Sequence, residues 1–263
     1  MVMGILNLTP DSFYDGGNFK NENHLLNHTQ KMTDEGATII DLGAQSTRPG
    51  AELLSAKTEW ERLQKPLVLL RKNFPEVIFS VDTFYAEVAS NAVNEGADII
   101  NDISGGTMDA HMFETIGRLK IPYVLMHILG TPKTMQLNPH YGNVVKEVMN
   151  FFSDRLNTLN SAGVTDIIID PGFGFGKTVE HNFELLNNLN LFQIFERPLL
   201  TGFSRKSMVN KVIGTTPETG LSGTTVLNTI ALLKGASILR VHDVKEAVEA
   251  IKLTNHVHQF DQG

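Results

Sequence analysis

Short apolar runs alternate with amphipathic segments along the whole chain. The runs are rich in Val and Ile, which is typical of strands buried on both faces of a parallel sheet, and they end near Asn7, Asp41, Asp82, Asn101, His127, Asp170, Gly202 and His242. The segments between them have the helical spacing of apolar residues. They cover residues 25–34, 55–73, 85–94, 110–119, 144–161, 179–190, 204–234 (with a break near Thr216 and Pro217) and 244–258.

This alternation predicts a parallel sheet joined by right-handed helical crossovers. Eight strand–helix units in 263 residues fit a closed (βα)8 TIM barrel, which commonly uses ~250 residues as one domain. We therefore expect an α/β protein with a single domain over residues 1–263. An open doubly wound sheet is the structural alternative.

A local motif recurs at four of the predicted strands. Each copy has a glycine, then a short apolar run, then a polar residue; the copies end at Asp41, Asn101, Asp170 and Arg240. The glycine is suited to the left-handed position that ends a helix. The polar residue then falls at the carboxyl end of a strand, which is the face of a TIM barrel that carries the active site.

Composition narrows the class of protein further. The chain has 22 Lys and Arg against 29 Asp and Glu, a formal charge of −7, which argues against a general nucleic-acid surface but leaves room for a local anion pocket. The absence of cysteine excludes disulfides, thiolate metal sites and cysteine nucleophiles. No apolar run is long enough to span a membrane and no secretion signal precedes the first strand, so we expect a cytoplasmic protein.

Three polar strand ends favour recognition of a flat heterocycle. Asp82, Asn101 and Asp170 each follow an apolar run, and carboxylates and amides can pair with the amino and ring N–H groups of a pterin- or guanine-like ring. Taken singly, each residue could merely cap its strand. Met126 could pack on a ring face, and the glycines after Asp170 would let Phe175 approach the ligand.

Two later segments favour an anion. Ser204 and Lys206 lie where the chain enters a predicted helix, whose N-terminus attracts anions, and Arg240 and His242 alternate on one side of a strand. A mono- or diphosphate fits here, while the alternative is a surface arginine and a structural histidine. The segment Gly176-Lys177-Thr178 is no nucleotide-binding P-loop, because proline stands at position 171 where that motif needs glycine.

Other candidates carry weaker signals. Asn7 ends the first strand and could offer its amide oxygen to Mg²⁺. Thr47 and Arg48, in the second long loop, are donors suited to an anion. His127 is as compatible with a structural role as with a catalytic one.

Together these segments resemble the dihydropteroate synthase family of pterin-binding TIM barrels. The matching stretches run in order along nearly the whole chain: residues 4–13, 46–50, 82–83, 101–106, 126–127, 130–132, 135–136, 170–177, 202–207 and 240–242. The resemblance implies that 6-hydroxymethyl-7,8-dihydropterin diphosphate condenses with 4-aminobenzoate to give 7,8-dihydropteroate and diphosphate, a step of folate synthesis. It also implies a Mg²⁺ cofactor, competition by sulfonamides and a homodimer.

The resemblance assigns roles residue by residue. It implies that the pterin is held by Asp82, Asn101, Asp170 and Lys206, with Met126, Phe175 and Gly202 around it. It implies that the diphosphate is held by Asn7, Thr47, Arg240 and His242, with Asn7 helping to place Mg²⁺. Around aminobenzoate it implies Phe13, Thr47, Pro49, Lys206 and Ser207. Lys206, Asp82, Asp170, Arg240 and His242 are the expected catalytic residues.

Two departures from the family pattern stand out. Gln45 occupies a position that is more often Glu before the segment Ser-Thr-Arg-Pro-Gly, so we expect altered contacts of that loop. The chain begins inside the first strand, so we expect either a trimmed chain or a barrel floor covered in another way. Two other functions stay open: a non-catalytic pterin-binding homologue, and a pterin methyltransferase, which should lack the Ser-Thr-Arg-Pro-Gly loop.

Overall fold

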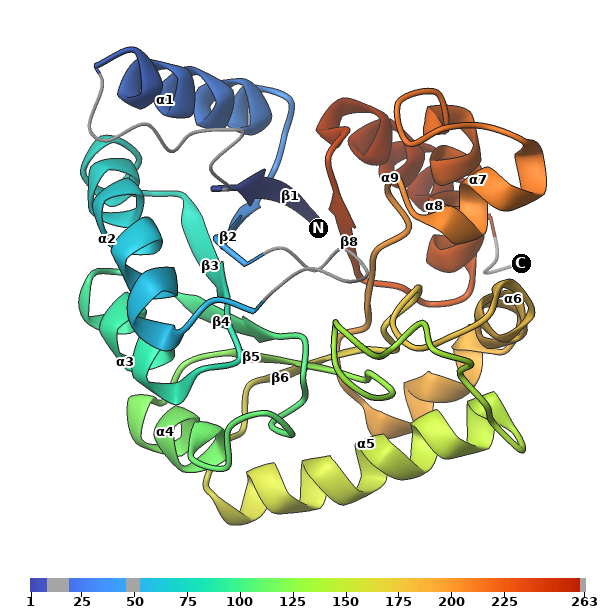
Figure 1. The fold of residues 1–263 in the computed structure, drawn as a ribbon. Coiled ribbons are helices and arrows are strands. Elements are labelled where there is room, and N and C mark those ends of the chain that lie inside the picture. The colour runs from blue at the N-terminus through green and yellow to red at the C-terminus, as the bar shows by residue number, and fades with distance from the viewer. Residues whose placement is uncertain (9–18, 46–52, 261–263) are drawn as a thin grey trace.

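The computed structural model describes residues 1–8, 19–45 and 53–260, and residues 19–21 only in their backbone (Figure 1). Parallel strands surround the centre of the molecule and helices surround the strands. The strands are β1 (Val2–Asn7), β2 (Ile39–Gly43), β3 (Ile78–Asp82), β4 (Ile99–Asp102), β5 (Tyr123–Met126), β6 (Ile167–Asp170), β7 (Leu200–Thr201) and β8 (Ile238–Val241).

The strands form one nearly closed barrel. Their order is β6-β5-β4-β3-β2-β1-β8-β7, so β1 pairs with both β2 and β8. Between β6 and β7 the link is an isolated bridge, Ile169 to Leu199, beside a hydrogen bond from the amide of Ile169 to the carbonyl of Pro198 of 3.0 Å. The predicted (βα)8 TIM barrel of a single domain is therefore confirmed, and the open sheet is excluded.

Strand β7 is shorter than the sequence predicts. The sequence predicts a strand that starts at Pro198 and ends at Gly202, but the strand contains only Leu200 and Thr201. Pro198 has no N–H to give to a ladder, and Gly202 already belongs to the loop that follows. The barrel is consequently weakest in backbone hydrogen bonds beside β7.

The helices follow the strands around the barrel (Figure 1). They are α1 (Phe19–Asp34), α2 (Ala56–Asn73), α3 (Ala86–Asn94), α4 (Met112–Leu119), α5 (Val144–Ser161), α6 (Val179–Asn187), α7 (Ser207–Ile213), α8 (Leu221–Leu233) and α9 (Val244–His258), with a 3₁₀ helix, η1 (Leu189–Phe195), after α6. Side-chain caps fix several starts: Ser55 accepts from the amide of Thr58, and Asn143 from that of Lys146.

The predicted helix over residues 204–234 is two helices. The first turn of α7 begins at Ser207 rather than Ser204, and the helix ends at Gly214, whose φ of 69° is left-handed. Pro217 follows in the connection to α8. The motif glycines also behave as predicted, with φ values of 101°, 100°, 80° and 98° at Gly36, Gly96, Gly163 and Gly235.

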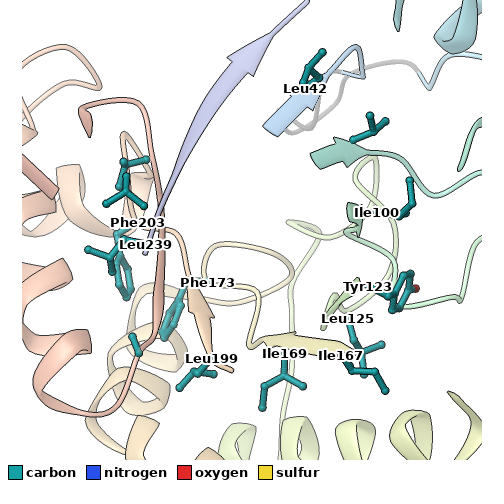
Figure 2. Packing of buried hydrophobic residues seen from close by; sticks show 14 of the residues in the cluster. Leu42, Ile100, Tyr123, Leu125, Ile167, Ile169, Phe173, Leu199, Phe203 and Leu239 are labelled. Carbon is teal, nitrogen blue, oxygen red and sulfur yellow. The ribbon is translucent and has the colours of Figure 1, made fainter. Parts of the chain in front are cut away.

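Two apolar layers hold the barrel together. The larger lies between strands and helices, and Figure 2 shows part of it, including Leu42, Ile100, Leu125, Ile169 and Leu239, on the outer side of the strands. Neighbouring positions on a strand face opposite sides, so the second cluster fills the barrel interior: Met3, Ile39, Ile78, Ile99, Val124, Ile168, Leu200 and Ile238. This second cluster is the floor beneath the site. None of the helices in the described part of the chain is long and apolar enough to cross a membrane.

Candidate active site

The site is built on the barrel floor by the period of two along each strand. A residue two positions beyond a floor residue faces the same interior, and here those residues turn from apolar to polar. Asp41 follows Ile39, Asn101 follows Ile99, Asp170 follows Ile168 and Arg240 follows Ile238. The sequence therefore places a polar layer directly on an apolar floor, at the carboxyl end of the barrel.

Arg240 connects two carboxylates in this layer. Its Nε donates to Oδ2 of Asp41 at 2.7 Å, and its Nη2 donates to Oδ2 of Asp82 at 3.0 Å. The same Asp41 oxygen accepts from Nδ2 of Asn101 at 3.0 Å. Residues predicted to bind the anion and residues predicted to bind the ring are thus joined through one carboxylate.

The electrostatics of the group follow from its burial. The side chains of Asp41 and Asp82 are 0% and 8% exposed. Burial raises the pKa of Asp82, with further contributions from the neighbouring carboxylates, while Arg240 opposes the shift. The carboxylates raise the pKa of Arg240 against the effect of its burial, so the guanidinium stays charged.

Asp170 and Lys206 form the other side of the layer. Burial raises the pKa of Asp170, and Lys206 is the largest opposing influence. Burial lowers the pKa of Lys206 to about 8, against the attraction of Asp170. The ammonium of Lys206 donates to the carbonyl of Phe173 at 2.5 Å and lies 4.7 Å from the ring centre of Phe175. It therefore stands beside an aromatic face and a carboxylate, as a ligand-orienting cation would.

His242 is held as a neutral imidazole. Its Nδ1 lies 2.9 Å from Oγ of Ser204, and that same Oγ accepts from the backbone N–H of His242 at 3.3 Å. The serine proton is then free to donate to Nδ1, which favours the tautomer with its proton on Nε2. Burial and then the nearby cations Arg205, Arg240 and Lys206 lower its pKa to about 3. The hydroxyl of Ser204, which the sequence predicts at a helix start, is thus used by His242.

The predicted ring contacts also gather at the barrel mouth. Met126 and Phe175 are buried in one small apolar cluster with Phe84, Ile103, Ile128 and Met135. A Cβ atom on Gly202 would lie 3.8 Å from the Lys206 ammonium, so the absence of a side chain there keeps that ammonium uncovered on one side. An apolar wall thus meets the polar layer described above.

Asn7 lies near Asp82 across a glycine. Asn7 is exposed at the end of β1, in register with Gly43. A Cβ on Gly43 would lie 3.6 Å from Cβ of Asp82 and 3.9 Å from Oδ1 of Asn7. The bare glycine therefore leaves space beside both residues.

The structure does not describe all of the predicted site residues. Phe13, Thr47 and Pro49 lie outside the described residues, as do Ser46, Arg48 and Gly50. Ser207 is described and is exposed at the first position of α7.

The segment from Asp170 to Lys177 does not form a phosphate cradle. Lys177 turns inward and is 3% exposed. Its ammonium lies 3.0 Å from Nδ1 of His127 and donates to the carbonyls of Gly172 and Phe175 at 2.9 and 3.0 Å. These contacts are those expected for a structural His127, and they agree with the rejection of a P-loop.

The unusual Gln45 has a defined structural role. Its amide donates to Oε2 of the fully buried Glu59 at 2.9 Å, and its amide oxygen accepts from the backbone of Leu54 at 2.8 Å. Tyr85 donates to the carbonyl of Leu54 at 2.7 Å. The two described ends of the second long loop are thereby tied together.

Sequence reasoning gave no role to two residues that the structure brings into the site region. Asp41 was recognised only as a strand end, and Lys177 only as part of a rejected motif. The repeat contained a signal for Asp41, because it occupies the same place as Asn101 and Arg240 in their copies. Its Oδ1 is buried without a hydrogen-bond partner among the described residues.

Comparison with known proteins identifies the class. The sequence pattern of the family described as "pterin binding enzyme" matches residues 3–242. This barrel, with polar strand ends over an apolar floor, is thus that of a pterin-binding enzyme.

The relatives narrow the class. The chain is 44% identical to the dihydropteroate synthase of Haemophilus influenzae over 96% of this chain and 92% of the relative. It is 43% identical to that of Escherichia coli over 96% and 89%. The crystal structure of Yersinia pestis dihydropteroate synthase with a sulfonamide drug complex has a TM-score of 0.91 and 41% identity, over 98% of this chain and 94% of that one. The chain therefore belongs to the dihydropteroate synthase family of pterin-binding enzymes.

Proposed function

We propose that the chain condenses 6-hydroxymethyl-7,8-dihydropterin diphosphate with 4-aminobenzoate to give 7,8-dihydropteroate and diphosphate. The observation that carries the proposal is the double ion pair of Arg240 with Asp41 and Asp82. It sets an anion-binding cation one hydrogen bond from Asp82, a carboxylate suited to a pterin. A related structure, the dihydropteroate synthase of Xanthomonas albilineans in complex with 7,8-dihydropteroate, is 34% identical, with a TM-score of 0.86, over 98% of this chain and 93% of that one.

Ring recognition falls to the polar layer. Asp82, Asn101 and Asp170 offer oxygens to the amino and ring N–H groups of the pterin, and the Asn101 amide can also donate. Lys206 would donate to a ring acceptor from above Phe175. Met126 and Phe175 would supply the apolar contacts of a flat ring. The two carboxylates then offset positive charge that develops on the pterin as its C–O bond breaks.

Departure of the diphosphate falls to Arg240 and His242. The guanidinium is charged and offers N–H groups to the leaving oxygens. His242 is neutral, so it acts as a hydrogen-bond donor through Nε2 and not as a second cation. Once the C–O bond has broken and its electron pair has left with the diphosphate, the amine of aminobenzoate attacks the methylene carbon, forms the C–N bond and releases its proton. No enzyme nucleophile is needed.

Aminobenzoate recognition rests on the family pattern. Phe13, Thr47, Pro49, Lys206 and Ser207 are the proposed contacts, and Ser207 and Lys206 adjoin each other at the start of α7. The Gln45 pair with Glu59 supports this proposal, since it ties both described ends of the loop that carries Thr47 and Pro49.

Mg²⁺ is the proposed cofactor, and the donor set fits a particular kind of site. The described residues contain no group of three His, Asp or Glu side chains that would hold a metal. Mg²⁺ is often bound by few protein oxygens together with substrate phosphates and water, which matches the single amide oxygen of Asn7 beside the side-chain-free Gly43. When bound there it would neutralise charge on the leaving diphosphate.

A homodimer is proposed from the surface of α8 and α9, which contact each other. Exposed apolar side chains gather on these helices: Val226, Leu233, Leu253 and Val257. Exposed apolar groups in number mark association surfaces. Sedimentation should give a dimer, and Leu233→Lys should give a monomer. The cytoplasmic location stays a prediction from the sequence.

Incubation with both substrates and Mg²⁺ tests the function. The proposal expects stoichiometric release of diphosphate and 7,8-dihydropteroate, and inhibition by a sulfonamide that aminobenzoate relieves. Tight pterin binding without diphosphate release would refute it and would favour a non-catalytic pterin-binding protein.

A further inference from the structure

The loop after β6 has its carbonyl groups held by side chains. Gly172, Gly174 and Gly176 have φ values of 69°, 83° and 64°, so the backbone follows neither helix nor strand and must find other partners. All carbonyls from residue 172 to residue 176 find one. Lys177 binds those of Gly172 (2.9 Å) and Phe175 (3.0 Å), Lys206 that of Phe173 (2.5 Å), Gln136 that of Gly174 (2.8 Å) and Tyr141 that of Gly176 (2.8 Å).

Lys177 differs from the other donors, because it also reaches the neighbouring loop. Its ammonium lies 3.0 Å from Nδ1 of His127 and 3.4 Å from the carbonyl of the same residue. His127 directly follows Met126, the last residue of β5. Burial and the charge of Lys177 lower the pKa of His127 to about 2, so the imidazole is neutral and can accept. One ammonium thereby clamps the loops after β5 and β6.

The two loops approach each other closely at the clamp. A Cβ on Gly172 would lie 1.9 Å from the carbonyl oxygen of His127. The two backbones are thus in contact where Lys177 sits, and Met126 and Phe175, which flank the contact, belong to one buried cluster.

The clamp also reaches the pterin carboxylate. Oδ1 of Asp170 accepts from the amide of Gly172 at 2.8 Å, and the carbonyl of that glycine accepts from Lys177. A fully buried ammonium is costly unless its partners compensate. If this buried position needed only hydrogen-bond donors, a neutral side-chain amide could supply them. The positive charge of Lys177 therefore indicates a further role.

We propose that Lys177 is a positioning residue of the pterin site, which clamps the loops after β5 and β6 and supplies positive charge that keeps Asp170 ionised under the ring. This inference rests on the proposed function only in taking a pterin as the ligand. Lys177 touches no substrate. It acts through Gly172 and Asp170.

The surrounding charges support this role. Lys206, Arg240 and Lys177 all lower the pKa of Asp170, against the effect of burial. Asp170 raises the pKa of Lys177, which burial and Lys206 lower to about 7. Below pH 7 Lys177 is therefore charged. Protonation of Asp170, whose pKa burial raises, would set an acid limb of pterin binding, and the charge of Lys177 opposes that shift.

The test measures the dissociation constant of 6-hydroxymethylpterin by fluorescence titration between pH 4 and pH 8. This ligand lacks the diphosphate, so Arg240 and His242 contribute little. The variants are Lys177→Met, which removes donors and charge, and Lys177→Gln, which keeps donors and removes charge. Tyr141→Phe is the matched control, because it frees the carbonyl of Gly176 without changing any charge.

Both Lys177 variants should move the acid limb to higher pH by about one unit, the usual effect of one nearby opposite charge, and should weaken binding about fivefold at the wild-type midpoint. Tyr141→Phe should leave the limb in place. A uniform loss of affinity at all pH values would overturn the proposal, as would loss of the fold in both variants, since Lys177 would then serve the core alone. Failure of wild type to bind the pterin would instead refute the proposed function.

Discussion

Nε of Arg240 lies 2.7 Å from Oδ2 of Asp41, a residue 199 positions earlier in the chain. The contact joins β8 to β2 across the barrel interior. It holds the guanidinium by one edge, so that Nη2 reaches Asp82. Because Asn101 donates to the same Asp41 oxygen, the cation for the leaving group and the amide for the ring share one anchor.

Asp41→Asn should therefore impair both substrate halves. An amide at this position cannot balance the guanidinium, and breaking a buried pair leaves an uncompensated charge. We expect unfolding free energy to fall by about 2 kcal/mol and kcat/KM for the pterin diphosphate to fall about 100-fold, equal to ~2.7 kcal/mol. Urea unfolding and steady-state kinetics measure the two effects. Asp34→Asn, exposed on α1, is the control; equal behaviour of the two variants would contradict the anchor.

Lys206 should set an alkaline limb of activity. Burial lowers its pKa to about 8, and the charged form is the one that can donate to the ring. The activity should thus fall as pH rises through about 8. Lys206→Arg keeps its charge throughout this pH range. The variant should therefore show no fall in activity near pH 8, even if its rate is lower than that of wild type. A limb unchanged by this substitution would assign the titration to another group.

Removal of the Lys206 ammonium should reduce turnover sharply. Lys206→Ala should lower kcat/KM by about 10³, the upper range for loss of one oriented donor. Lys211→Ala, on the exposed side of the same helix, should retain the wild-type value. Comparable losses in both would indicate damage to α7 and not to the site.

Asp170→Asn should act on the pterin and not on aminobenzoate. The amide removes one charge and one acceptor while it preserves shape. We expect KM for the pterin diphosphate to rise and kcat to fall. KM for aminobenzoate should change less than about twofold, because Asp170 is assigned to the pterin and not to aminobenzoate. Wild-type kcat/KM in this variant would remove Asp170 from the assigned role.

Glu59 should make stability depend on pH. Burial raises its pKa from the model-peptide value of 4.5 to about 7, so the folded state binds the proton more tightly than the unfolded state does. The associated stability is complete below pH 4.5 and is lost as pH rises through about 7. Glu59→Gln should match wild type near pH 5 and should exceed it by up to about 3 kcal/mol at pH 8. Equal Tm values at pH 8 would contradict a destabilising effect of the buried Glu59 carboxylate.

Much of this architecture could be predicted from local patterns. In the repeat that ends in Asp41, Asn101 and Arg240, each polar residue directly follows two apolar residues. The glycines of the repeat have left-handed φ values, as predicted. Period-two alternation then puts these residues inside the barrel. Parallel strands with helical crossovers leave few topologies, so the barrel followed from the pattern.

Other features depend on contacts that no local pattern encodes. Ser204 fits a helix start by composition, but the backbone and ring of His242 use its hydroxyl. The neutrality of His242 comes from burial beside cations of other segments. Lys177 was visible only as part of a poor P-loop, because one of its partners, His127, lies 50 residues earlier in the chain. Such roles arise only when the strand ends meet.

A crystal structure of the protein with 6-hydroxymethyl-7,8-dihydropterin diphosphate and Mg²⁺ would test the central claim most directly. The account predicts the ring among Asp82, Asn101 and Asp170 beside Lys206, and the diphosphate against Arg240 and His242, with Asp41 still joined to Arg240. A ligand bound away from this polar layer, or a ring whose N–H groups contact none of the three, would contradict it.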